Sequence, residues 1–322
     1  MSATRCNSTV FRQNGERERA LDVVVVCEIN VDIVVTGLSG PPDFGAERLV
    51  DAVTLTAGSS GVLAATGMAD LGLHVGVCGL VGADLFGHYM LDHLDRHGID
   101  RAGVVVDPAE RTGAGVLLST PHDRAILTFA GAMACFGLSR VRFEVVARAR
   151  HLHLSSYFLQ QALQPDVPAL LARAHELGLT TSADTGHDPA ETWQIDGLLE
   201  ELDVFLPNEV EARAITGAAT AAEALERLLA RVPTVAVKRG VAGALAGHGS
   251  ERVDVPGFAV EAIDTTGAGD AFDAGFLTGL LAGEDLAACV RRGNACGALT
   301  AVHVGGSGGF DRARVEALLS SA

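Results

Sequence analysis

Short β-branched runs alternate with longer helical segments along most of the chain from Leu21 onward. The first run covers residues 22–27, and its unbroken apolar character is typical of a strand that is buried on both faces. Alternating strands and helices predict a largely parallel sheet with helices on both sides, whose ligands bind beyond the carboxyl ends of the strands. Further strands are expected at residues 74–80, 151–155, 179–184, 204–206 and 234–237, and helices at residues 61–71, 85–97, 166–177 and 221–231.

Two parts of the chain depart from this alternation. Residues 48–56 alternate polar and apolar side chains, and so do residues 113–120 and 124–129, which Pro121-His122-Asp123 joins as a hairpin turn. We expect these strands, within about residues 33–56 and 112–130, to form a small sheet that packs over the main domain as a lid.

The composition limits the classes of partner. The chain has 322 residues, of which 48% are hydrophobic, and its 40 acids against 24 bases give a formal net charge of −16. This charge repels nucleic-acid phosphates and anionic membranes, so neither is expected as a partner. The six cysteines contain no C-x-x-C pair, so neither structural zinc nor a disulfide framework is expected.

The N-terminal residues suggest where the folded part begins. Residues 1–20 contain several arginines but no apolar core, so they do not resemble a signal peptide. No run in the chain reaches the roughly 20 apolar residues that cross a bilayer. We therefore expect a disordered tail over residues 1–20, one domain over residues 21–322, and a cytoplasmic location.

The strongest functional signal is the segment at residues 264–277, which reads Asp-Thr-Thr-Gly-Ala-Gly-Asp-Ala-Phe-Asp-Ala-Gly-Phe-Leu. Residues 260–263 are expected to end a strand, and residues 270–281 to form a helix. Gly267, Ala268 and Gly269 would then form a turn whose N–H groups, together with the helix dipole, attract an anion. Asp270 at the helix start is expected to keep its negative charge easily and to accept a proton from an attacking hydroxyl group.

This segment resembles, position by position, the C-terminal signature of the ribokinase-like, or PfkB, carbohydrate kinases, and the resemblance extends over about residues 21–322. It implies an α/β fold, a ribokinase-like three-layer sandwich with a mainly parallel central sheet and a small β-sheet lid. It also implies phosphate transfer from ATP, with Mg²⁺, to a hydroxyl group of a small sugar. In that family the Gly-Ala-Gly backbone is the anion hole and the next Asp is the base, and these roles fall on Gly267, Ala268, Gly269 and Asp270.

Two further motifs resemble the sugar and magnesium sites of the family. Asn30 and Asp32 alternate to the same side of a strand, as the sugar-binding Asn and Asp of the family do. Asn208 and Glu211 match the N-x-x-E motif that helps to hold magnesium and its waters. Their spacing also fits a helix capping box, and both roles can hold together.

A strand–turn–strand at residues 234–244 resembles the segment that lies beside the nucleotide in the family. Lys238 would lie near the phosphates, Gly240 and Gly243 would permit the turn, and Asn294 matches a position in the adenine pocket. The alternative for Lys238 is a solvated lysine at the end of a strand.

Some members of the family also bind a monovalent cation such as K⁺ beside the anion hole. Asp264 and Thr266, with the turn at Gly305-Gly306, match that neighbourhood.

The chain departs from the family in the region that meets the substrate. The two glycines and the following Asn of the family are reduced to Gly58, and a glycine gives way to Cys27. Residues 184–193 lack the arginine with which 2-keto-3-deoxygluconate kinases bind their acidic sugar, although Val237-Lys-Arg-Gly240 is similar to those enzymes. A neutral sugar is therefore the expected substrate.

Other functions and assemblies stay open. A nucleoside kinase or a sugar acid kinase of the same fold is an alternative. So is a catalytically degenerate protein that binds sugar or nucleotide and signals through its lid. The lid strands could also pair two copies of the chain into a homodimer.

Overall fold

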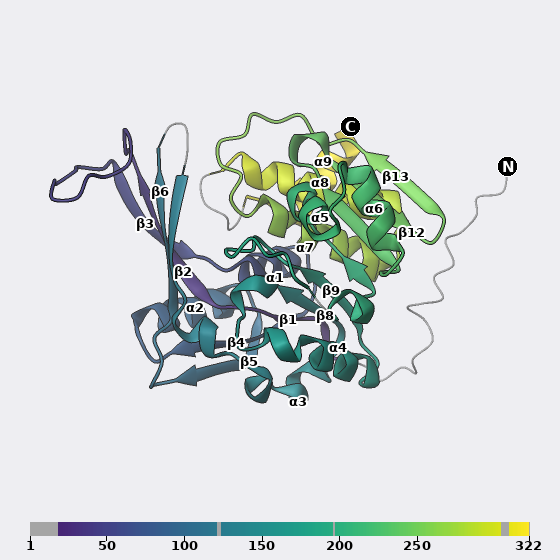
Figure 1. Ribbon diagram of the computed structural model, residues 1–322, viewed down its shortest axis with the longest axis horizontal. Coiled ribbons are helices and arrows are strands. Elements are labelled where there is room, and N and C mark those ends of the chain that lie inside the picture. Colours follow the sequence, from purple (N-terminus) through teal and green to yellow (C-terminus); the bar gives the residue numbers. More distant parts are fainter. Residues whose placement is uncertain (1–18, 121–123, 196, 304–308, 322) are drawn as a thin grey trace.

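The computed structural model describes residues 19–120, 124–195, 197–303 and 309–321, and its centre is a nine-stranded sheet (Figure 1). Seven of the nine strands, from β11 to β5, are parallel to one another, and β12 and β13 at one edge continue antiparallel. In order across the sheet, the strands are β13 (Glu251–Val255), β12 (Ala244–His248), β11 (Thr234–Lys238), β10 (Val204–Phe205), β9 (Thr180–Asp184), β8 (Ala149–Ser155), β1 (Leu21–Val26), β4 (Val75–Gly82) and β5 (Asp100–Asp107).

Helices cover both faces of this sheet and enclose two hydrophobic cores. On the central strand β1, Val24 and Val26 belong to one core while Val23 and Val25 belong to the other, as the alternation of side chains along a strand requires. The first face carries α3 (Phe143–Val146), α4 (Val167–Glu176), α5 (Glu209–Thr216) and α6 (Ala221–Leu229). The second carries α1 (Ser60–Asp70), α2 (Leu85–Arg96), α7 (Ala268–Ala282) and α8 (Leu286–Ala301), with α9 (Arg312–Ser321) against α8.

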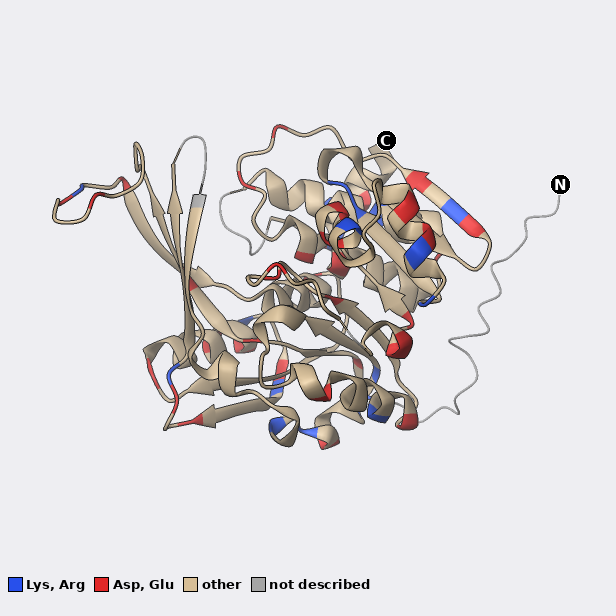
Figure 2. Cartoon of the chain, viewed as in Figure 1, with Lys and Arg blue, Asp and Glu red and all other residues tan. Residues whose placement is uncertain are grey.

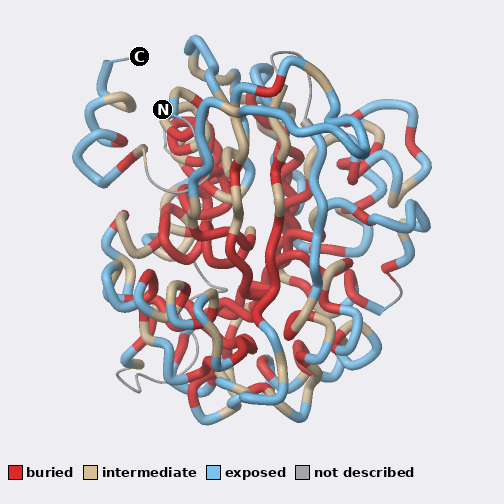
Figure 3. The backbone as a smooth tube through the Cα atoms, turned by 90° about the vertical axis from the view of Figure 1, so that its left-hand side faces the viewer, coloured by how far each residue is buried: buried red, intermediate tan, exposed pale blue. Residues whose placement is uncertain are grey.

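The burial pattern follows from these three layers. Figure 3 shows buried backbone in the middle of the molecule and exposed segments around it. This arrangement confirms the α/β fold that the sequence predicts, a three-layer sandwich with a mainly parallel central sheet. No helix within the described ranges is both long enough and apolar enough to cross a membrane.

A separate four-stranded sheet projects from the side of the main body (Figure 1). β2 pairs antiparallel with β3 and parallel with β6, and β6 pairs antiparallel with β7. Residues 37–51 between the first two strands contain no strand, and the turn expected at residues 121–123 lies outside the described residues. In order across this sheet, which we call the lid sheet, the strands are β3 (Ala52–Ala57), β2 (Asn30–Thr36), β6 (Gly113–Ser119) and β7 (Arg124–Phe129).

The segment before α7 differs from its expected structure. Residues 260–263 do not end a strand. Instead, the N–H groups of Ile263 and Asp264 both donate to the carbonyl oxygen of Ala301 at the end of α8, at 2.8 and 3.2 Å. Because a helix end supplies the acceptor, the chain is held here without a neighbouring strand.

Charged side chains are distributed over the outside of the molecule. Figure 2 shows Asp and Glu on many outer helices and loops, with Lys and Arg interspersed on the same elements. The net negative charge is therefore spread over the surface.

Candidate active site

The candidate site is built around the first turn of α7, which packs against α1 (Figure 1). Gly267 precedes the helix with a φ of 73°, a left-handed conformation that glycine adopts without strain. Within the described ranges no side chain caps this helix start. The N–H of Ala268 donates to the carbonyl oxygen of Thr265 at 3.2 Å, so an anion would meet the other N–H groups of the turn. Asp270 is the third residue of the helix and is only partly buried, which keeps its carboxyl group within reach of a substrate.

The carboxyl group of Asp270 is a weaker acid than the sequence suggests. Burial raises its pKa to about 7 and the negative charge of Asp184 adds to this rise, while Lys238 and a hydrogen bond from Ser60 oppose it. The expectation that the helix start keeps Asp270 charged is therefore wrong, because a helix dipole contributes only about 0.3–1 kcal/mol at such a position. A carboxyl group with a pKa near neutrality can accept a proton and release it again.

Lys238 is buried between two carboxylates at the end of β11. Its Nζ donates to Asp184 Oδ2 at 2.6 Å and to Asp273 Oδ1 and Oδ2 at 3.0 and 3.1 Å. The alternative of a solvated lysine is therefore wrong. A Cβ atom placed on Gly269 would lie 3.6 Å from this ammonium group, so Lys238 lies directly beside the glycine turn.

The sequence reasoning did not identify Asp184 and Asp273 as parts of the site. Asp184 and Asp273 meet only because β9, which carries Asp184, and β11, which carries Lys238, lie on either side of β10 and end at the same edge of the sheet. No local sequence pattern contains that information. Asp270 and Asp273 are three residues apart, and this spacing, which puts both carboxyl groups on one helix face, could have indicated the second acid.

The predicted sugar-binding residues meet at the base of the lid sheet. Asn30 Nδ2 donates to Asp32 Oδ1 at 3.1 Å, and burial raises the pKa of Asp32 to about 6. A Cβ atom on Gly58 would lie 2.4 Å from Asn30 Nδ2 and 2.5 Å from Asp32 Oδ1. Since Asp32 is also among the charges that act on Asp270, this group and the α7 turn belong to one site.

The segment that lacks the family's Asn forms the start of α1. Ser59 caps this helix at a φ of 70°, and its hydroxyl accepts a hydrogen bond from the N–H of Val62 and donates to the carbonyl oxygen of Glu28. The N–H of Ser60 donates to Glu28 Oε1 at 3.1 Å, and burial raises the pKa of Glu28 to about 8. Val62 is itself fully buried, so it contributes to the core in this region.

The predicted magnesium residues form the start of α5. Asn208 Oδ1 accepts from the N–H of Glu211 at 3.0 Å, and Glu211 Oε2 accepts from the N–H of Asn208 at 2.9 Å, which is a complete capping box. Burial, followed by the charge of Asp184, raises the pKa of Glu211 to about 7. Asn208 also forms a parallel bridge with Lys238, so this helix start lies beside the cluster of Lys238, Asp184 and Asp273.

The predicted nucleotide residues lie farther along the same edge. Gly240 and Gly243 have φ angles of 56° and 82°, which other residues rarely adopt. A Cβ atom on Gly243 would lie 2.1 Å from the carbonyl oxygen of Val255. Asn294 Nδ2 donates to the carbonyl oxygens of Val255 and Pro256 at 3.1 Å each, so it fixes the loop that follows β13.

The candidate cation site is only partly described. Thr266 donates to Asp264 Oδ1 through its N–H at 2.9 Å and through its hydroxyl at 2.7 Å. The Gly305-Gly306 turn lies outside the described residues.

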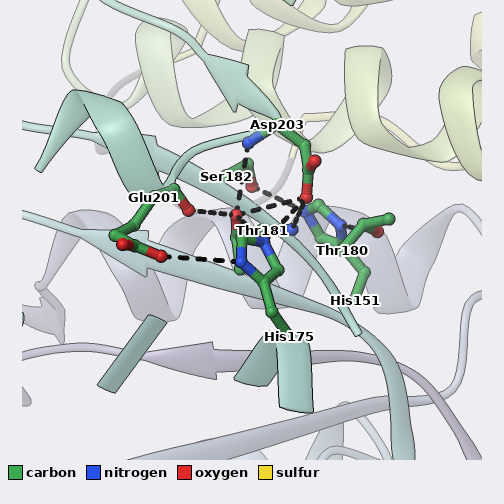
Figure 4. Close-up of polar contacts among 7 residues, drawn as sticks. All are labelled: His151, His175, Thr180, Thr181, Ser182, Glu201 and Asp203. Atoms are coloured by element: carbon green, nitrogen blue, oxygen red, sulfur yellow. Dashed lines mark hydrogen bonds and ion pairs between the residues drawn. The ribbon is translucent and has the colours of Figure 1, made fainter. Parts of the chain in front are cut away.

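A polar network lies at the amino ends of β8 and β9, at the opposite end of β9 from Asp184 (Figure 4). Thr181 donates its N–H to Asp203 Oδ2 at 2.8 Å, and His175 Nε2 lies 3.2 Å from the same oxygen. His151 is fully buried, with its Nε2 2.7 Å from the hydroxyl oxygen of Ser182. This network joins the end of α4 to the start of β10 and is separate from the candidate site.

Comparison with known proteins gives the family. The chain matches the model described as pfkB family carbohydrate kinase over residues 20–312. It is 31% identical over 287 residues to the ATP-dependent ribose-1-phosphate kinase of Halopiger xanaduensis, and the match covers 87% of this chain and 92% of the relative.

Solved structures agree with this family. The PfkB protein of Polaromonas sp. JS666 shares 26% identity with a TM-score of 0.80, covering 92% of this chain and 100% of that one. The ribokinase of Arabidopsis thaliana, solved with ribose and ATP, has the same fold with a TM-score of 0.81 at 24% identity, covering 93% of this chain and 99% of that one. The resemblance that residues 264–277 carry is thus confirmed, and the chain belongs to the pfkB family of ATP-dependent carbohydrate kinases.

Proposed function

We propose that this chain transfers the terminal phosphate of ATP to a hydroxyl group of a small neutral sugar, within one kinase domain over residues 21–322. The observation that carries the proposal is the position of Asp270. Its carboxyl group, with a pKa of about 7, follows directly on a glycine turn and lies within the electrostatic reach of Asp32. A base, an anion-binding turn and a group that can bind sugar hydroxyls are therefore together at one end of α7.

The chemistry assigns a role to each part of this turn. The sugar hydroxyl donates its proton to the Asp270 carboxylate as its oxygen attacks the terminal phosphorus atom of ATP. The N–H groups of Gly267, Ala268 and Gly269 stabilise the charge on the transferring phosphoryl group. Positioning and charge neutralisation account for most of the catalysis in phosphoryl transfer, so this set of groups suffices.

Magnesium and the nucleotide fit the same edge of the sheet. The oxygen atoms of Asn208 and Glu211 are the hard ligands that Mg²⁺ prefers, and they would hold the ion partly through its waters. When bound, Mg²⁺ neutralises phosphate charge. Lys238, Gly240, Gly243 and Asn294 are the proposed ATP-binding residues, with Lys238 acting as a fixed charge beside the phosphates because its hydrogen bonds go to Asp184 and Asp273.

The substrate class is a neutral sugar, held by Asn30 and Asp32 beside Gly58. Residues 184–193 contain no arginine that could pair with a sugar acid. The Halopiger relative is named for a phosphorylated ribose, so sugar phosphates belong in the substrate panel together with nucleosides and sugar acids.

Three further expectations belong to this proposal. The lid sheet, whose exposed apolar residues include Val53, Leu127 and Phe129, can pair with a second copy of the chain. Asp264 and Thr266 would contribute to a K⁺ site, and the enzyme would act in the cytoplasm.

A coupled ADP-release assay with MgATP against sugars, sugar phosphates, sugar acids and nucleosides tests the function. We expect turnover with a neutral sugar, and a loss of about two to four orders of magnitude in Asp270→Asn, which is the usual contribution of a general base. Near-normal turnover in that variant would remove the proposed role of Asp270. Binding of sugar without ADP release by the unmodified chain would favour the degenerate binding protein.

A further inference from the structure

Three secondary-structure elements bring charged side chains together beneath the glycine turn. Asp184 ends β9 and Lys238 ends β11, with β10 between them, and both side chains lie on the face of the sheet that α7 covers. Asp273 reaches the same point from α7, one turn after Asp270. The exposed fraction of the side chain is 10% for Lys238, 9% for Asp184 and 1% for Asp273, so water screens these charges weakly.

The three groups balance one another's charge. Burial alone would raise the pKa of Asp184, but the charge of Lys238 together with hydrogen bonds to Asp273, Lys238 and the N–H of Gly186 lowers that pKa to about 2. Burial would lower the pKa of Lys238, but Asp184 and then Asp273 raise it. Burial raises the pKa of Asp273 well above its usual value; Lys238 opposes this rise and the charge of Asp184 adds to it. The cluster thus joins one ammonium to two carboxyl groups whose pKa values are shifted in opposite directions.

We propose that Lys238, Asp184 and Asp273 form a positioning cluster, which fixes the first turns of α7 and sets the charge that surrounds Asp270. The proposal deepens the function given above, because it rests on Asp270 as the base. Unlike phosphate binding by Lys238, it requires no contact between Lys238 and the nucleotide.

The start of α7 needs an anchor of this kind. Within the described ranges it has no side-chain cap, and two of the three residues before Asp270 are glycines. Asp270 and Asp273 lie on one helix face, so an ion pair that holds Asp273 also fixes the rotation of α7 and the direction of the Asp270 carboxyl group. The ammonium of Lys238, next to Gly269, adds a positive charge beneath the turn that meets the phosphoryl group.

The cluster also sets how easily Asp270 ionises. The acids that surround Asp270 come from several elements, and Lys238 is the positive group that acts on it from β11. With Lys238 present, its positive charge opposes the rise that Asp184 causes in the pKa of Asp270. Without Lys238, Asp184 and Asp270 would compete for one negative charge. The acids around Asp270 are Glu28 after β1, Asp32 in β2, Asp184 in β9, Glu211 in α5 and Asp273 in α7.

The test compares Lys238→Met with the double variant Lys238→Met/Asp184→Asn. In the single variant we expect the pKa of Asp270 and the acid limb of the kcat profile to move up by about one pH unit or more. Removing Asp184 as well removes the competing charge, so the double variant should return towards the original profile. The Asp270 pKa is measured by carbon NMR on protein with labelled aspartate carboxyl groups, with Asp270→Asn to assign the signal.

A matched pair at the other end of the sheet controls for a general loss of charge. Arg150 donates to Asp22 Oδ1 at 2.6 Å across the amino ends of β8 and β1. Arg150→Met, alone and combined with Asp22→Asn, should leave the Asp270 pKa unchanged.

Each outcome decides the proposal. The proposal is overturned if the Asp270 pKa does not shift in Lys238→Met. It is also overturned if the Asp270 pKa stays as high in the double variant as in Lys238→Met. If Lys238→Met does not fold, the double variant Lys238→Met/Asp184→Asn still decides. A cluster with a purely structural role would be lost in the double variant, and the Asp270 pKa would then not stay close to its original value. The NMR pKa is independent of turnover, so full activity in Asp270→Asn would remove the proposed base and leave the cluster to be judged by NMR.

Discussion

Gly58 lies so close to Asn30 and Asp32 that an added Cβ atom would fall within 2.5 Å of both side chains. Real Cβ atoms are not found that close to polar atoms, so Gly58→Ala must displace Asn30 and Asp32, the pair proposed to bind the sugar. We expect the KM for the sugar to rise about tenfold or more, the equivalent of about one lost hydrogen bond, with a smaller change in the KM for ATP. Steady-state kinetics with each substrate varied in turn measures both.

Gly40→Ala is the matched control for this change. Gly40 is in the loop between β2 and β3, its φ is not left-handed, and a Cβ atom there would meet nothing within 4 Å. This variant should keep the original KM for the sugar. An equal rise in both variants would show that glycine flexibility near the lid, and not the space beside Asn30 and Asp32, determines sugar binding.

At the same scale, the sequence predicts which residues gather but not how strongly they interact. Asn30, Asp32 and Gly58 could be brought together from strand alternation and the family motif. The pKa of Asp270 could not be predicted, because it depends on burial and on Asp184, which is 86 positions away in the chain. Cys27, which replaces a glycine of the family, packs against Gly61, and the sequence does not show this contact. A Cβ atom on Gly61 would lie 2.1 Å from the Cβ atom of Cys27.

At the scale of elements, the capping box of α5 combines a structural role with a proposed chemical one. Asn208→Ala removes the side chain that accepts from the N–H of Glu211, so the free energy of unfolding should fall by about 1 kcal/mol. If Asn208 also holds magnesium waters, the Mg²⁺ concentration for half-maximal activity should rise several-fold. Urea unfolding and a Mg²⁺ titration of the ADP-release rate measure the two effects separately.

The start of α6 supplies a control for the loss of a cap. Thr220 caps that helix by accepting from the N–H of Glu223 at 3.2 Å. Thr220→Ala should lower the free energy of unfolding by a similar amount and leave the Mg²⁺ requirement unchanged. The metal role of Asn208 would be refuted if both variants showed the same Mg²⁺ dependence.

Helices and strands could be predicted where one sequence pattern dominates the segment. The buried β-branched run at residues 22–27 predicted β1, and the glycine turn predicted where α7 begins to within a few residues. Residues 260–263 were predicted to end a strand, yet the apolar Val260 and Ile263 are exposed, and the segment is held by the end of α8. Apolar composition alone cannot separate a strand from a loop that a distant helix end holds.

At the scale of the whole molecule, buried acids make stability depend on pH. Burial raises the pKa of Glu28 to about 8 and the pKa values of Asp270 and Glu211 to about 7. In this pH range the folded chain binds protons at these sites, whereas the unfolded chain, with carboxyl pKa values near 4, has lost them. The stability that these protonated groups provide is therefore lost as the pH rises through the folded pKa values.

The buried histidines change the free energy of unfolding in the opposite direction, but they do so at lower pH. Burial lowers the pKa of His151 to about 3 and that of His153 to about 4, so their contribution is complete once the unfolded chain's histidines are neutral, above about pH 6.5. Between about pH 6.5 and pH 8.5 the acids thus dominate, and the free energy of unfolding should fall by on the order of 2 kcal/mol.

Glu28→Gln keeps a neutral side chain of the same shape and should remove the largest share of this fall. Urea unfolding at both pH values measures the slope, with the exposed Glu226→Gln as control, and an unchanged slope in Glu28→Gln would show that Glu28 is ionised in the folded chain.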